Sequence, residues 1–145
     1  MRIDDLHLAI SARLAVVGVN ATLQTAAFSF SRPGIGLLVV CGDTGAAAGV
    51  LTKSDLVRHL ATAGATDTPV AQLMSWPILS CKPDDDVYGV WRTMTARKLQ
   101  NVPVLGVDLK PLGTLDIRDA MQVLFEHEQY QEQALIDYVA GVGYR

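Results

Sequence analysis

The sequence repeats itself with an offset of 64 residues, and this repeat constrains the fold more than any other feature of the chain. Residues 49–55 read Gly-Val-Leu-Thr-Lys-Ser-Asp, and residues 113–119 read Gly-Thr-Leu-Asp-Ile-Arg-Asp. An apolar run typical of a buried strand precedes each motif, at residues 36–40 and 101–105. A fixed period of this length indicates two copies of one structural unit.

Each copy carries the same order of predicted elements. Helical patterns lie at residues 23–30 and 87–98, and short strands come before them, near residues 14–17 and 78–81. Each repeated motif then spans the end of a strand and the start of a helix. Each copy is therefore predicted as strand, helix, strand, strand, helix, with turn residues that suit a hairpin between the two adjacent strands.

Two such units predict a mixed α/β (α+β) fold in which the copies pack by pseudo-twofold symmetry. One copy of about 60 residues would be marginally stable alone, whereas two copies can share one core. We expect a first domain at residues 1–63 and a second at residues 64–125, with a linker at residues 64–69. Pro69 can then open a short helix. Clefts between two related units are favoured sites for small ligands.

A helical pattern continues from Asp116 to about Ala140 and is ended by Gly141. Residues 126–145 have no counterpart in the first copy, so we expect them to form a C-terminal helical extension. Apolar residues recur along this helix at helical spacing. We expect the extension to contact the second subunit of a homodimer, and packing back onto its own domain is the alternative.

Composition and charge exclude several classes of function. The chain has 145 residues, half of them hydrophobic, and a formal net charge of −3. The basic residues are scattered, which argues against nucleic acid as a partner. No apolar run is long enough to cross a bilayer, and the N-terminus does not resemble a signal peptide. Cys41 and Cys81 predict reduced, buried thiols, so we expect a cytoplasmic protein without a membrane partner.

No set of catalytic residues stands out in the sequence. His7, His59 and His127 lie far apart, and none has a cysteine or a second histidine at metal-ligand spacing. No Ser-His-Asp, Cys-His or paired-carboxylate arrangement is recognisable. We therefore predict that the protein is not an enzyme, requires no cofactor and holds no metal ion.

The paired motif, the Val-Pro-Val strand at residues 102–104 and the order of elements resemble a tandem pair of cystathionine β-synthase (CBS) domains, often called a Bateman module. Residues 69–74 (Pro-Val-Ala-Gln-Leu-Met) and 82–87 (Lys-Pro-Asp-Asp-Asp-Val) are similar to the start of a second CBS domain. The resemblance covers nearly the whole chain. It implies a homodimer that regulates another protein and binds AMP, ADP, ATP, NAD(H) or S-adenosylmethionine between the copies.

The motif of the first copy carries the residues expected to hold such a ligand. The helix after Thr52 offers free backbone N–H groups to a phosphate, and the Thr52 hydroxyl and the Lys53 ammonium can add to them. Asp55 is an acceptor suited to the two hydroxyls of a ribose, and Gly49 lets the backbone approach closely. Thr52 and Asp55 also fit a capping box, which needs no ligand.

The second copy departs from the family pattern, because Asp116 stands where a threonine or serine is usual. Asp116 can cap the helix but would repel a phosphate, so this site could be empty, bind a neutral part of a ligand or hold a bridging cation. Asp119 remains available for a ribose. Arg118 could offset the charge of Asp116, but we expect its side chain to be solvated. The resemblance implies that Asn101 and Pro103 lie along a cleft near the base or the phosphate.

Two hypotheses of function remain open at this stage. The first is an adenosyl-ligand sensor, in which the ligand favours one arrangement of the copies, and the intact Thr52 and Asp55 support it. The second is a structural or partner-binding dimer whose clefts hold no ligand, and Asp116 supports it. A magnesium sensor built on Asp55, Asp116 and Asp119 is a weaker third.

Overall fold

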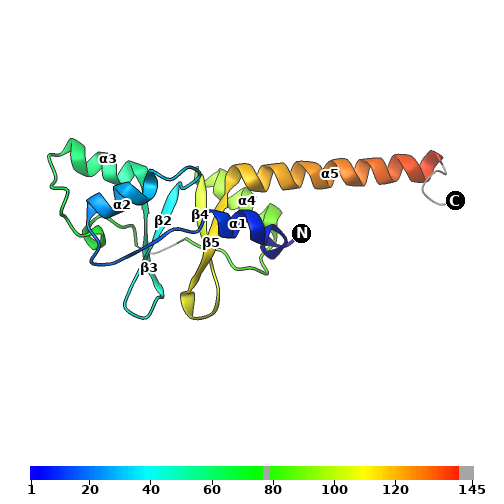
Figure 1. Cartoon of the computed structure of the whole chain (residues 1–145). Coiled ribbons are helices and arrows are strands. Elements are labelled where there is room, and N and C mark those ends of the chain that lie inside the picture. The colour runs from blue at the N-terminus through cyan, green and yellow to red at the C-terminus, as the bar shows by residue number, and fades with distance from the viewer. Residues whose placement is uncertain (77–78, 141–145) are drawn as a thin grey trace.

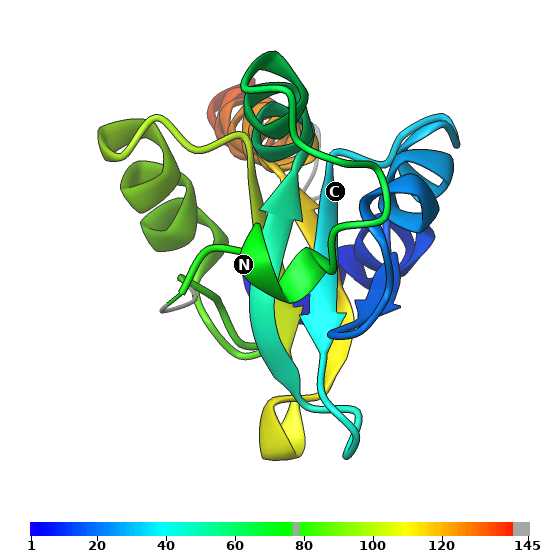
Figure 2. The same cartoon turned by 90° about the vertical axis from the view of Figure 1, so that its left-hand side faces the viewer.

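The computed structural model describes residues 1–76 and 79–140, and in it the two copies form two sheets that face each other (Figures 1 and 2). The first copy consists of β1 (Val16–Gly18), α2 (Leu23–Phe30), β2 (Leu37–Cys41), β3 (Ala47–Thr52) and α3 (Lys53–Ala61). The second copy consists of α4 (Val87–Ala96), β4 (Asn101–Leu105), β5 (Pro111–Asp116) and α5 (Ile117–Ala140). The predicted mixed α/β fold is confirmed.

The strand pairing repeats between the two copies. β2 pairs in parallel with β1 and in antiparallel with β3, and β4 pairs in antiparallel with β5. The strand predicted near residues 78–81 is reduced, in the part of it that the structure describes, to one parallel bridge between Cys81 and Val104. The register of the pairing shifts after Val40 in β2 and after Val104 in β4. These two positions are 64 residues apart, so the repeat includes the irregularity in the strand pairing.

Strand β2 is buried on both faces, which explains its unbroken apolar sequence. Side chains alternate between the faces of a strand, so Leu38 and Val40 pack in the first core, which α2 and α3 cover. Leu37 and Val39 point the other way, into a small cluster that includes Leu105 of β4. This second face is where the two copies meet.

Each copy is preceded by a segment that packs on the other copy. The chain begins with η1 (Ile3–Leu6) and α1 (His7–Ala12), and their apolar residues lie in the core of the second copy. The corresponding segment between the copies contains η2 (Val70–Gln72), which packs in the core of the first copy. Residues 3–10 belong to the predicted first domain by sequence, yet their contacts tie the two copies together.

Two glycines allow this exchange of leading segments, in which each segment packs on the copy that it does not precede. A Cβ added at Gly113 of β5 would collide with the backbone carbonyl of Ile10. A Cβ added at Gly49 of β3 would lie 2.6 Å from Sδ of Met74. Both pairs are related by the same offset of 64 residues, so the close approach that Gly49 permits is to a segment of the protein itself.

Helix α5 confirms the predicted C-terminal helix up to Ala140, and Gly141 lies outside the described residues. Its first half packs against α4 and β5, whereas its second half projects beyond the body of the molecule (Figure 1). Leu135, Ile136 and Val139 are exposed there. None of the described helices combines the length and the apolar character needed to span a membrane.

Candidate functional site

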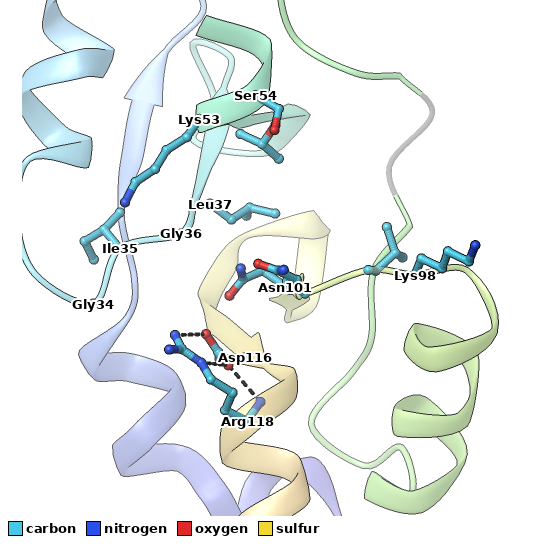
Figure 3. Close-up of a pocket in the computed structure, with 13 residues that line it drawn as sticks. Gly34, Ile35, Gly36, Leu37, Lys53, Ser54, Lys98, Asn101, Asp116 and Arg118 are labelled. Atoms are coloured by element: carbon cyan, nitrogen blue, oxygen red, sulfur yellow. Dashed lines mark hydrogen bonds and ion pairs between the residues drawn. The ribbon is translucent and has the colours of Figure 1, made fainter. Parts of the chain in front are cut away.

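A cleft of about 510 Å³ opens where the two copies meet (Figure 3). Its walls come in pairs 64 positions apart: residues 34–37, which lead into β2, correspond to residues 98–101, which lead into β4, and Thr52 and Ser54 correspond to Asp116 and Arg118. The cleft therefore lies on the pseudo-twofold axis, beside the N-termini of α3 and α5. Four of the predicted site residues line it, namely Thr52, Lys53, Asn101 and Asp116.

The motif of the first copy forms the predicted capping box. The Thr52 hydroxyl accepts a hydrogen bond from the backbone N–H of Asp55 at 3.4 Å. Oδ2 of Asp55 accepts from the Thr52 backbone N–H at 2.8 Å and from its hydroxyl at 3.1 Å. The other oxygen, Oδ1, accepts from Arg58 at 3.3 Å, and the Arg58 side chain is 73% exposed. The Asp55 side chain is only 13% exposed, so the solvated part of this ion pair is the arginine.

In the motif of the second copy, arginines balance the negative charge of Asp116. Asp116 is buried and caps α5 by accepting from the backbone N–H of Arg118 at 2.8 Å. The Arg118 guanidinium also donates to both carboxylate oxygens, at 3.0 and 2.9 Å. Arg118 is thus paired with Asp116, as the alternative interpretation of the sequence had it, while its side chain remains 75% exposed.

The pKa of Asp116 reflects these contacts. Burial alone would raise this pKa, but the hydrogen bonds from Arg118 and the charge of Arg13 outweigh burial and lower it. Nη1 of Arg13 lies 3.6 Å from Oδ2 of Asp116. The carboxylate therefore stays ionised, and its charge is balanced by neighbouring guanidinium groups.

Asp119 is engaged by an arginine that sequence reasoning missed. Nε of Arg13 donates to Oδ2 of Asp119 at 2.6 Å, and Nη2 donates to Oδ1 at 3.2 Å. The hydrogen bond to Asp119 is the main reason why the pKa of Arg13 is raised. Because 106 residues separate the partners and Arg13 lies in neither motif, no local pattern points to this pair.

The remaining predicted residues differ in their relation to the cleft. Asn101 lines it, and its Oδ1 is buried with no hydrogen-bond partner among the described residues (Figure 3). Pro103 is buried within β4, where its carbonyl accepts from the backbone N–H of Cys81 at 3.0 Å. Pro103, Gly49, Asp55 and Asp119 are not among the residues that line the cleft.

The described part of the chain contains no group of three histidine, cysteine or acidic side chains that could hold a metal ion. The three acids of the magnesium hypothesis are divided between separate contacts. Asp55 lies in the capping box of α3, whereas Asp116 and Asp119 face arginines. This arrangement lends the magnesium hypothesis no support.

Comparison with known proteins agrees with the repeat. The model of the CBS domain family matches residues 4–62 and 70–126, so the chain belongs to this family and carries two copies of its domain. Arabinose 5-phosphate isomerase GutQ of Escherichia coli O6:H1 is 30% identical over 106 residues, which are 73% of this chain. They are 33% of that protein, so the chain spans about a third of the length of the curated relatives first matched.

Solved structures share the fold over most of the chain. The CBS domain pair of protein MJ0100, in complex with 5′-methylthioadenosine and S-adenosyl-L-methionine, is 19% identical, with a TM-score of 0.74 over 88% of this chain and 98% of that one. The CBS domain protein PAE2072 from Pyrobaculum aerophilum, complexed with AMP, is 21% identical, with a TM-score of 0.73 over 82% and 89% of the respective chains. At these identities the likeness establishes the fold alone.

Proposed function

We propose that this chain is a regulatory module that binds an adenosyl ligand between its two CBS domains and acts by binding rather than by catalysis. The ligand is AMP, ADP, ATP, NAD(H) or S-adenosylmethionine, and the module works as a cytoplasmic homodimer on another protein. The observation that carries the proposal is the cleft of about 510 Å³ that both copies line, with Thr52 and Lys53 on its wall. The relatives MJ0100 and PAE2072, which are complexed with adenosyl compounds, support this ligand class.

The residues around the cleft suit the separate parts of such a ligand. The N-terminus of α3 and the ammonium of Lys53 favour a phosphate or another anionic group. Oδ1 of Asp55, held by the exposed Arg58, is an acceptor for a ribose hydroxyl. The buried Oδ1 of Asn101 can accept a hydrogen bond from an amino group such as that of adenine.

Regulation follows from the position of the cleft on the pseudo-twofold axis. A ligand that contacts loops of both copies stabilises the arrangement in which both loops reach it. The shift between arrangements equals the difference in the affinity of the ligand for them. Residues 34–37 and 98–101 end in the first residues of β2 and β4, whose side chains meet between the sheets, so a change at the cleft reaches the surface between the copies.

A thermal-shift screen tests the proposal. A ligand at about 100 times its Kd adds about 2.7 kcal/mol to the free energy of unfolding, which raises the Tm by roughly 5–10 °C. We expect such a shift with one of AMP, ADP, ATP, NAD, NADH or S-adenosylmethionine, with or without magnesium. We expect Asp55→Asn to weaken or abolish it, because the amide can still cap α3 but binds ribose hydroxyls less well than the carboxylate does.

Asp85→Asn is the matched control, because Asp85 accepts from the backbone N–H three residues before it at 2.8 Å, as Asp55 does. The control variant should keep the full ligand-induced shift. A flat response of the unmodified protein to every ligand would overturn the sensor. That outcome would favour the second candidate, a ligand-free dimer or partner-binding module, which the exposed apolar residues Leu135, Ile136 and Val139 of α5 support.

A further inference from the structure

The motifs of the two copies differ in the cations that contact their acidic residues. Asp55 and Asp119 occupy the same place in the first turn of α3 and of α5. Oδ1 of Asp55 accepts from Arg58, whose side chain is 73% exposed. Both oxygens of Asp119 accept from Arg13, whose side chain is only 21% exposed.

Arg13 is fixed by more than its pair with Asp119. Nη1 donates to the backbone carbonyl of Gly34 at 2.8 Å and lies 3.6 Å from Asp116. The guanidinium thus joins the segment before β1, the loop before β2 and the start of α5. Bidentate pairs between arginine and a carboxylate are among the strongest hydrogen bonds in proteins. A neutral ribose would have to displace this cation and leave two acidic groups without it, which is unfavourable.

The repeat does not preserve this arginine in the sequence of the other copy. The residue 64 positions after Arg13 is Pro77, whose side chain carries no hydrogen-bond donor. The repeat therefore pairs a positively charged arginine at one position with an uncharged proline at the equivalent position of the sequence.

We propose that Arg13 is a built-in plug that occupies the ribose position at Asp119, so that each chain binds a single adenosyl ligand, at Asp55. The plug also makes Arg13 the residue that decides how many ligands the module holds. This inference rests on the proposed function, because it concerns the second of the two positions that such a ligand could take.

Isothermal titration calorimetry of the full chain with AMP, ADP, ATP, NAD, NADH and S-adenosylmethionine, each titrated separately, tests the plug. We expect one ligand per chain for the unmodified protein and two per chain for Arg13→Gln, with the affinity of the first position unchanged. The double variant Arg13→Gln/Asp119→Asn should return to one ligand per chain, which assigns the gained site to Asp119. Arg32→Gln removes an exposed arginine outside the cleft and should leave the stoichiometry at one.

The outcomes separate the two proposals. Two ligands bound to the unmodified chain, or one bound to a folded Arg13→Gln variant, would overturn the plug and leave the sensor intact. No binding of any of these six ligands to the unmodified chain and to Arg13→Gln would overturn both proposals. If Arg13→Gln does not fold, Arg13→Lys keeps a charge beside Asp119 without the bidentate geometry and should admit a second, weaker ligand. The stoichiometry of the unmodified chain tests the plug in every case.

Discussion

Replacing Gly113 with alanine tests how the two copies are held together. The new Cβ would collide with the backbone carbonyl of Ile10, and a backbone atom cannot rotate away. Helix α1 would have to move off β5. At Gly49 the corresponding Cβ would lie 2.6 Å from Sδ of Met74, and this side chain can change its rotamer to make room. The same Cβ would lie 3.0 Å from the backbone carbonyl oxygen of Ser75, which would have to give by only a few tenths of an ångström.

The free energy of unfolding should fall further at Gly113, where the added Cβ overlaps backbone atoms deeply, than at Gly49, where the deepest overlap is with a flexible side chain. Overpacking of a core usually costs about 1–3 kcal/mol, while alanine in a strand is favoured over glycine by roughly 0.5–1 kcal/mol. We expect Gly113→Ala to lower the free energy of unfolding by about 2–3 kcal/mol and Gly49→Ala to lower it by at most about 1 kcal/mol. Gly18 of β1 has no atom within 4 Å of an added Cβ, so Gly18→Ala should be neutral or slightly stabilising.

Urea unfolding followed by circular dichroism measures these differences, with the m-value as a check that each variant unfolds by the same transition. The expected order of stability is Gly18→Ala at or above the unmodified protein, then Gly49→Ala, then Gly113→Ala. A Gly113→Ala variant as stable as the unmodified protein would refute the packing of α1 on β5.

Two further predictions follow from the ionisable groups. The pKa of Asp116 lies below its ordinary value of 3.8, so its ionised form stabilises the fold above that pH, and this contribution is lost as the pH falls through the folded-state pKa. Asp116→Asn should therefore lose less stability between pH 7 and pH 3 in urea unfolding, and an equal loss in both proteins would contradict this. Burial, with a smaller effect from Asp85, raises the pKa of Cys81 to about 12, so a disulfide reagent at pH 8 should modify the less buried Cys41 in the folded protein and Cys81 only on unfolding. Equal rates for the two thiols would count against it.

The repeat located most elements correctly because strands and helices of this fold carry strong local patterns. The predicted helix at residues 23–30 and the strand at residues 101–105 coincide with α2 and β4. Helix α1 went unpredicted, because its apolar residues are complementary to a strand that lies about 100 residues further along the chain. The apolar content of β2 was readable from sequence, but not that its second face meets the other copy.

In the candidate site, too, contacts between residues close in sequence were predictable, whereas contacts between distant residues were not. The capping box of Thr52 and Asp55 involves residues three positions apart, so their sequence was enough to predict it. The pair between Arg13 and Asp119 depends on the exchange of leading segments, which brings the end of α1 to the start of α5. Local reasoning could weigh Arg118 as a partner of Asp116, two positions away, but it missed Arg13, which contacts both Asp116 and Asp119.

Hydrogen–deuterium exchange with and without saturating adenosyl ligand tests the central claim most directly, because it reports where the ligand binds. We expect slower exchange at residues 34–37 and 98–101 and in the first turn of α3. The effect should be smaller in the first turn of α5, where Arg13 binds Asp119. Unchanged exchange around the cleft, or protection confined to segments away from it, would contradict ligand binding between the two CBS domains.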